Sequence, residues 1–271
     1  MKNGKWDLRI RRASQLASAH PFASEGLEFY RHVLQFQKSL YSDLQKECGT
    51  AKEPRPAGAL RQELDLFLLL PRFSAFLAVI EKSAPAALAR SAGALRGLDG
   101  ARWQELLTEF WGAGPSFVGT LAAADALISW IFLQPYAEYL ADYTHQPPLH
   151  STPSVCPLCS SRPQVGVLRP EGDGGKRALI CALCANEWAF RRLVCPACGE
   201  EDVHKLAVYT AKEFPHVRVE ACDACRAYIN TVDLTKDGHA VPVVDELATV
   251  PLNLWAVEHG YTKIQTNLLG I

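Results

Sequence analysis

Eight cysteines give this sequence its clearest chemical potential, because they form four C-x-x-C pairs. The chain has nine cysteines, and eight of them lie between positions 156 and 225. The pairs are Cys156/Cys159, Cys181/Cys184, Cys195/Cys198 and Cys222/Cys225. A C-x-x-C turn points two thiolates at one ion about 2.3 Å away, and two such turns complete a tetrahedron. Four pairs therefore predict two metal ions, each bound by four thiolates.

The segments between the pairs indicate which pairs share an ion. Cys159 and Cys181 are separated by 21 residues with a strand, turn, strand pattern, and Cys198 and Cys222 by 23 residues of the same character. A β-hairpin returns its ends to each other, so each hairpin should bring together the pairs at its base. We therefore expect site 1 to comprise Cys156, Cys159, Cys181 and Cys184, and site 2 to comprise Cys195, Cys198, Cys222 and Cys225. The alternative is an interleaved arrangement, in which the first pair joins the third and the second joins the fourth.

A short internal repeat supports the tandem arrangement. The sequence Val-Cys-Pro-Leu-Cys-Ser from residue 155 recurs as Val-Cys-Pro-Ala-Cys-Gly from residue 194, 39 residues later. The ten residues from Ala185 to Val194 contain Trp188 and Phe190 but no hairpin turn signal, so they are expected to be a connector. The sequence thus predicts two consecutive four-cysteine ribbons.

Redox chemistry is the competing explanation for the thiols. The N-terminus has no apolar run of roughly 7–15 residues, so no export signal is expected, and Arg11 and Arg12 are predicted to lie on a solvated helix face. In a reducing cytoplasm, clustered thiols favour metal over disulfides. Dithiol enzymes place C-x-x-C at the start of a helix after a strand, whereas these pairs flank hairpins. The ninth cysteine, Cys48, is expected to be an ordinary apolar side chain at a helix end.

The charge balance disfavours nucleic-acid binding. The chain carries 28 Lys and Arg against 29 Asp and Glu, and residues 151–234 contain ten of each sign. Each tetrathiolate site with a divalent metal adds about two negative charges. Without a basic surface, the dominant phosphate contribution to binding is missing, so no nucleic-acid partner is expected. A metal-ribbon nucleic-acid-binding or regulatory factor is the alternative class of function.

No catalytic motif accompanies the cysteines. The sequence lacks a G-x-S-x-G elbow, a Walker A loop and a dinucleotide fingerprint. With every metal position filled by thiolate, neither site keeps an open position for substrate or water. The sequence therefore predicts structural metals in a protein that is not an enzyme.

A helical bundle is predicted upstream of the cysteines. Apolar residues from Leu8 to Thr144 recur mostly at threes and fours, most regularly in Ser24–Glu47. The apolar run Phe117–Leu133 is 17 residues long and includes Asp125, so it is predicted to be a core helix that does not insert into a membrane. Further helices are expected over residues 59–70, 74–83, 85–95, 101–111 and 116–143.

Strands and a final helix are predicted after a Pro-rich linker at residues 146–154. Short strands are expected at Gln164–Leu168, Arg177–Ile180, Lys205–Tyr209, His216–Glu220 and His239–Val244. The final helix should run from Asp245 to His259, kinked by Pro251 and ended by Gly260. Its apolar stripe is expected to be Leu247, Val250, Leu254 and Val257.

Four stretches of the sequence resemble the formate dehydrogenase accessory protein FdhE family. They are CPLCSSRP, CALCANEWAFRRLVCPACG, ACDACRAYI and VDELATVPLNLWAVEHGY, and the opening RRASQLASAHPFASEGLEFYRHVLQFQ is similar to that family's N-terminal helical region. The resemblance implies a cytoplasmic assembly or proofreading factor. Its partner would be the catalytic subunit of a molybdenum- or tungsten-dependent formate dehydrogenase that is exported by the twin-arginine route. The family's metal ligands map onto the eight clustered cysteines, with iron or zinc as the bound metal.

These expectations combine into an α+β multi-domain fold. An N-terminal all-α helical bundle is followed by two tandem rubredoxin-like or zinc-ribbon four-cysteine modules and a C-terminal helix. The expected units are residues 1–145 for the bundle, 146–154 for the linker, 155–190 for the first ribbon, 191–234 for the second ribbon, and 235–271 for the C-terminal strand and helix.

Overall fold

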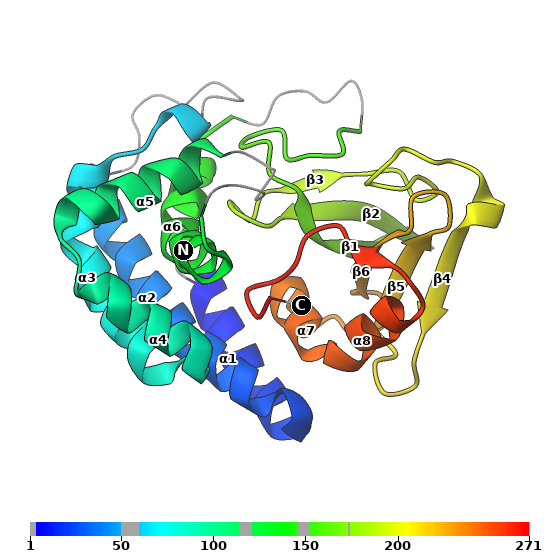
Figure 1. Cartoon of the computed structure of the whole chain (residues 1–271). Helices are drawn as coiled ribbons and strands as arrows, with labels where there is room; N and C mark the ends of the chain where they lie inside the picture. Colours follow the sequence, from blue (N-terminus) through cyan, green and yellow to red (C-terminus); the bar gives the residue numbers. More distant parts are fainter. Residues whose placement is uncertain (1–3, 50–59, 114–120, 146–151, 173, 271) are drawn as a thin grey trace.

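The chain folds into a helical half and a sheet-containing half that lie side by side (Figure 1). The computed structural model describes residues 4–49, 60–113, 121–145, 152–172 and 174–270. Six α-helices within these ranges come before the first strand. They are α1 (Gly4–Ala19), α2 (Ser24–Cys48), α3 (Leu66–Ser83), α4 (Ala86–Arg96), α5 (Gly100–Gly112) and α6 (Ala123–Asp142), with short 3-10 turns at Pro21–Ala23 and Leu60–Gln62. The predicted α+β class with an N-terminal helical region is confirmed.

Helix α6 is the central helix of this half. Every residue from Ile128 to Leu140 is buried, including the polar Gln134 and the charged Glu138, which agrees with the expected core helix. Residues 116–120 of the predicted helix lie outside the described residues. Among the described residues, no helix combines the length and the apolar character that crossing a bilayer requires.

The expected break between two helices at Pro71 is wrong, because α3 continues through this proline. Helix α3 begins later than expected, where the Asp65 side chain accepts a hydrogen bond from the Leu68 backbone N–H at 3.2 Å. Pro71 is exposed and lies in the second turn, so it removes one backbone N–H from the helix. The carbonyl that loses this partner belongs to Phe67, which is 89% exposed, so water can hydrate this end of the helix.

Strands from both four-cysteine ribbons form one continuous sheet. In the described part of the chain it has seven strands in the order β3-β2-β1-β6-β5-β4, and β7 pairs with β6. The strands are β1 (Pro163–Glu171), β2 (Gly174–Cys181), β3 (Glu187–Ala189), β4 (Leu206–Thr210), β5 (Val217–Cys222), β6 (Ala227–Asp233) and β7 (Thr262–Lys263), with a 3-10 turn at Val203–Lys205. Four of the five expected strands correspond to β1, β2, β4 and β5. Strand β3 lies in the expected connector, where Trp188 pairs with Leu179 of β2.

A parallel pairing between β1 and β6 joins the two ribbons. Gly166 of β1 lies opposite Thr231 of β6 in this pairing. A Cβ atom at position 166 would approach the Thr231 Oγ1 atom to 2.3 Å, so only glycine fits here. The close approach of the two strands therefore depends on the absence of a side chain at one position.

The C-terminal segment differs from its prediction in two ways. The expected strand His239–Val244 is wrong, because Pro242 begins α7 (Pro242–Ala248). The expected single helix is two helices, since α8 (Val250–Glu258) starts after Thr249 and places Pro251 in its first turn. This break rotates the second helix relative to the first, so Leu254 and Val257 are exposed while Leu252 and Ala256 are buried. Gly260, with a φ of 77°, follows the helix as expected.

The helical half packs against the sheet through both hydrophobic and charged contacts. One continuous hydrophobic core includes side chains of α2 and α6, of the first ribbon and of α7. Arg12 of α1 is mostly buried and donates to Asp245 and to Asp237, which corrects the expectation that it lies on a solvated face. Arg11 is exposed as expected. The proposed limits of the separate units stay predictions, and residues 146–151 of the expected linker lie outside the described residues.

Candidate metal centres

Each C-x-x-C pair is followed by a residue in the left-handed backbone region. The φ angles are 58° at Ser160, 51° at Ala185, 80° at Gly199 and 58° at Arg226. This conformation reverses the chain directly after the second cysteine, and it costs a non-glycine residue roughly 1–2 kcal/mol. The four turns therefore share one backbone geometry, although only one of them contains the glycine that favours it.

The sequence repeat at residues 155 and 194 is also a structural repeat. In the first turn, Ser160 N–H donates to the Cys156 carbonyl at 2.9 Å, and Cys156 N–H donates to the Ser161 carbonyl at 2.8 Å. The second copy has the same two bonds, from Gly199 to Cys195 and from Cys195 to Glu200, both at 2.9 Å. The local sequence thus encodes the same closed turn twice.

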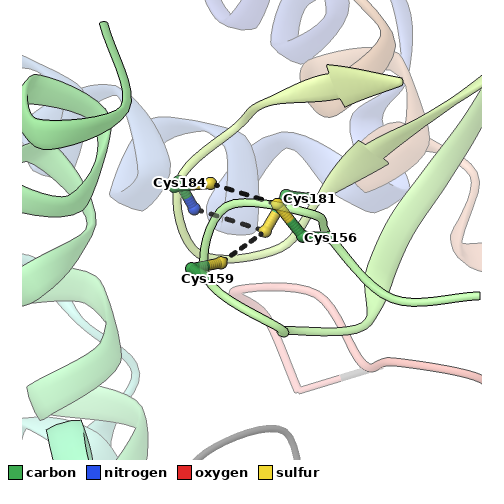
Figure 2. Close-up of side chains that lie close together, drawn as sticks. All are labelled: Cys156, Cys159, Cys181 and Cys184. Carbon is green, nitrogen blue, oxygen red and sulfur yellow. Dashed lines mark hydrogen bonds between the residues drawn. The ribbon is translucent and has the colours of Figure 1, made fainter. Parts of the chain in front are cut away.

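The two hairpins bring the cysteines together in the tandem grouping expected from the sequence. The first cluster comprises Cys156, Cys159, Cys181 and Cys184, and the second comprises Cys195, Cys198, Cys222 and Cys225. Within each cluster, the four sulfur atoms all lie within 4.8 Å of one another. Figure 2 shows the side chains of the first cluster converging from two separate turns. The structure does not have the interleaved arrangement.

The sulfur distances fit one tetrahedral metal ion in each cluster. The Sγ–Sγ distances are 3.6 Å for Cys156–Cys184 and 3.3 Å for Cys159–Cys181. In the second cluster they are 3.7 Å for Cys195–Cys225 and 3.8 Å for Cys198–Cys222. Four sulfurs about 2.3 Å from a central ion lie about 3.8 Å apart, whereas a disulfide needs about 2.05 Å. All nine cysteines are free thiols, so this spacing suits metal binding and does not suit disulfides.

Backbone and side-chain donors surround the sulfurs of the first cluster. Leu158 N–H donates to the Cys156 sulfur at 3.5 Å, and Leu183 N–H donates to the Cys181 sulfur at 3.4 Å. The Asn186 side-chain amide lies 3.8 Å from the Cys156 sulfur. Such donors stabilise a thiolate relative to a thiol and fix the direction in which the sulfur points.

Burial makes uncompensated negative charge costly in the first cluster. It raises the pKa of the Cys181 and Cys184 thiols, because water no longer solvates their thiolates. Hydrogen bonds from neighbouring thiols, that of Cys156 first, hold the pKa of Cys159 well below its usual range. A bound cation would supply the positive charge that four buried thiolates require.

Arg61 is a neighbour of the first cluster that sequence reasoning missed. Its Nε donates to the Cys159 carbonyl at 3.2 Å, and its Nη2 donates to the Ser161 hydroxyl at 2.8 Å. Burial lowers the pKa of Arg61, and the negative charge of the four cysteines opposes this shift. Arg61 lies almost 100 residues before the cluster, and no local pattern marks it, so only the folded chain reveals the contact.

The second cluster differs from the first in its exposure. Cys195 and Cys222 are buried, whereas Cys198 and Cys225 are exposed. A backbone N–H, that of Ala197, donates to the Cys195 sulfur at 3.4 Å. The two four-sulfur groups therefore share their geometry but not their surroundings.

A third group of potential ligands is occupied by an arginine. His216, Asp237 and Asp245 place ligand atoms within 4.8 Å of one another. The Arg12 guanidinium lies among them, with Nη2 2.9 Å from Asp237 and Nε 3.0 Å from Asp245. His216 Nε2 lies 2.9 Å from Asp245. This cation already pairs with both carboxylates, so the group is an ion-pair network that ties α1 to the sheet half.

Cys48 belongs to neither cluster. It is the last residue of α2 and is exposed. Its expected lack of a specific role stays a prediction.

Three comparisons relate the chain to known proteins. Residues 155–192 match the family model "FdhE, central domain", and residues 193–269 match "FdhE, C-terminal domain". "Protein FdhE homolog" of Aquifex aeolicus (strain VF5) is 26% identical over 99% of this chain and 96% of its own length. A Pseudomonas aeruginosa protein of the same name is 37% identical over 43% of this chain and 39% of its own length.

A solved structure resembles almost the whole chain. The crystal structure of the FdhE protein from Pseudomonas aeruginosa is similar with a TM-score of 0.75 and 26% sequence identity. The similarity covers 98% of this chain and 95% of that chain. The likeness therefore includes the helical half, which the two family models do not match.

Proposed function

The chain belongs to the FdhE family of formate dehydrogenase accessory proteins, and we propose that it binds the catalytic subunit of a formate dehydrogenase. In this proposal it acts in the cytoplasm, where it assists assembly or proofreading of that subunit before twin-arginine export. It acts as a binding protein and not as an enzyme. The observation that carries the proposal is a pair of four-sulfur clusters built into one sheet on a helical bundle.

We propose further that the eight clustered cysteines hold two metal ions, either iron or zinc. The sulfur spacing in each cluster supports this ligand set. In each cluster a bound ion would cross-link two turns of the chain. Binding of a structural zinc stabilises small zinc domains by on the order of 10 kcal/mol. Because sulfur would fill all four positions, the ions would have no open position for a substrate.

The arginine pairing in the sheet half supports a protein partner over a nucleic acid. Arg191 forms two hydrogen bonds with Glu201, at 2.6 and 2.9 Å. Arg169 pairs with Glu187 in the same bidentate way. Side chains that are already neutralised by carboxylates contribute little to phosphate binding. The alternative, a metal-ribbon nucleic-acid-binding or regulatory factor, has no specific observation in its favour.

A capture and complementation experiment tests the proposed function. The tagged chain is expressed in a host that lacks its own copy, and the catalytic subunit is measured in the purified complex together with formate dehydrogenase activity. Cys222→Ser should lose the second metal, capture little catalytic subunit and restore little activity, because the second hairpin loses a tether. Cys48→Ser is the matched control and should behave as the parent chain.

Two outcomes would contradict the proposal. One is full capture and full complementation by Cys222→Ser when its second metal is absent. The other is a salt-dependent shift of DNA or RNA by the parent chain without capture of the catalytic subunit, which would favour the alternative function.

A further inference from the structure

We propose that the two four-cysteine clusters differ in metal exchange, so that the first is a sealed structural centre and the second is an exchangeable centre open to external chelating ligands. This inference rests on the proposed metal binding. The two clusters would then differ in behaviour, although the sequence repeat makes them look equivalent.

The first cluster has little access to solvent. Cys156, Cys159 and Cys181 are each 1% exposed, and Cys184 is 3% exposed. Helix α6 covers the second turn of the cluster, where Trp130 Nε1 and Gln134 Nε2 both donate to the Ala182 carbonyl, at 3.0 and 2.9 Å. A ligand from solution would have to displace this helix contact before reaching the metal position.

Arg61 supplies a fixed positive charge to the first cluster. Two of its nitrogens bind the turn around Cys159 and Ser161, and a third, Nη1, donates to the Trp111 carbonyl at 2.8 Å. All four cysteines of the cluster are charge partners of this guanidinium. A divalent ion with four thiolates has a net charge of about −2, so a partly buried arginine stabilises the closed, fully coordinated state. Arg61 is thus a positioning residue for the first cluster.

The second cluster lacks this protection on one side. Its exposed members, Cys198 and Cys225, come from different turns, so each turn contributes one cysteine that solvent reaches. The Lys205 ammonium group interacts electrostatically with Cys222 of this cluster. Lys205 is exposed, and it already pairs with Glu200 at 3.2 Å. Water and salt screen such a surface charge. The buried Arg177 guanidinium donates to the Val194 carbonyl beside Cys195 at 3.3 Å. It already pairs with Glu220 at 2.5 Å, so it offers the second cluster less uncompensated positive charge than Arg61 offers the first.

The exchange is a ligand substitution without electron transfer. An external chelator would donate an electron pair to the ion, the Cys198 or Cys225 sulfur would leave the ion with its own electron pair, and the released thiolate would take a proton from the buffer. Repetition at the remaining sulfurs transfers the ion to the chelator. Because the incoming ligand must reach the ion first, exposure of the cluster determines the rate.

Metal release from the full chain loaded with zinc tests the inference. The bound zinc is counted first, and pyridylazoresorcinol then removes the metal and reports its release, while alkylated cysteines are mapped at successive times. The expected result is one fast equivalent with alkylation at positions 195, 198, 222 and 225, followed by one equivalent at least about tenfold slower. Arg61→Gln should raise the rate of zinc release from the first cluster about tenfold or more and leave the rate from the second cluster unchanged. Arg61→Lys keeps the positive charge, so its release rate from the first cluster should lie between those of the parent chain and Arg61→Gln.

The outcomes separate this inference from the proposed metal binding. Fewer than two zinc ions per loaded chain would contradict both. Two ions released at equal rates, or early alkylation of the first cluster, would overturn the exchange inference alone. Arg61→Gln could also release zinc from the first cluster as slowly as the parent chain does, with the same helical circular-dichroism signal. This result would show that Arg61 does not slow the release, and it would overturn the inference as stated.

Discussion

At the scale of single residues, the four cysteine turns depend on backbone conformation as much as on sulfur. The cysteine spacing in the sequence predicts the turns. It does not predict that Arg226 adopts the same left-handed conformation as Gly199. The Arg226 side chain lies on the Tyr261 ring and donates to the His259 carbonyl at 2.5 Å, contacts that depend on the final fold. Tertiary contacts thus stabilise a conformation that the residue itself disfavours.

Ser160→Gly and Gly199→Ala test whether the left-handed conformation sets the stability of the turns. Ser160 is exposed, and a Cβ atom at Gly199 would meet no described atom within 4 Å beyond its chain neighbours, so packing changes little at either site. Ser160→Gly should stabilise the metal-loaded protein by about 1 kcal/mol, because the left-handed strain is removed. Gly199→Ala should destabilise it by a similar amount. Chemical denaturation measures the free energy of unfolding of each variant. Changes of the same sign in the two variants would contradict the shared turn geometry.

At the scale of secondary structure, the sequence predicts elements better than their pairing. The cysteine spacing and the alternating residues predict both hairpins. The pairing of β1 with β6, which merges two ribbons into one sheet, has no local signal apart from Gly166. The helix break at Thr249 also changes which residues are buried, and a periodicity argument that assumes one helix cannot detect it.

The joint between the ribbons can be tested at Gly166. Gly166→Ala should lower the free energy of unfolding by about 1–3 kcal/mol, because the new methyl group would overlap the Thr231 hydroxyl. Thr231→Ala should cost only about 1 kcal/mol, for the lost buried methyl group, since its buried Oγ1 has no hydrogen-bond partner among the described residues. Combining the two substitutions should recover part of the loss. Additive effects of the two changes would contradict a direct clash at this position.

At the scale of the whole molecule, long-range polar contacts hold the helical half against the sheet half. Arg12, Arg61 and Trp130 each bind a group more than 50 residues away along the chain. Composition and periodicity could place these residues on helices or in a connection, but could not identify their partners. The first four-cysteine cluster therefore belongs structurally to the helical half as well as to its own hairpin.

The Arg12 network provides a test of this interface. Arg12→Ala should destabilise the protein by about 3–5 kcal/mol, because the buried Asp245 carboxylate, 1% exposed, loses its guanidinium partner. Arg11→Ala, at the exposed neighbouring position, should change stability by less than about 0.5 kcal/mol. Thermal unfolding with both metal ions bound measures the difference. Equal effects of the two substitutions would show that the network adds nothing to the interface.

Native mass spectrometry of the chain, purified without air exposure, counts the metal ions that the two cysteine clusters bind. Two four-cysteine sites should raise the mass by two metal ions per chain, identified by mass as iron or zinc. A brief pulse of N-ethylmaleimide without chelator should alkylate the exposed Cys48 and leave the eight clustered thiols unmodified. A chain that carries fewer than two ions, or that reacts at four or more clustered cysteines in this pulse, would contradict the assignment of two closed four-cysteine metal sites.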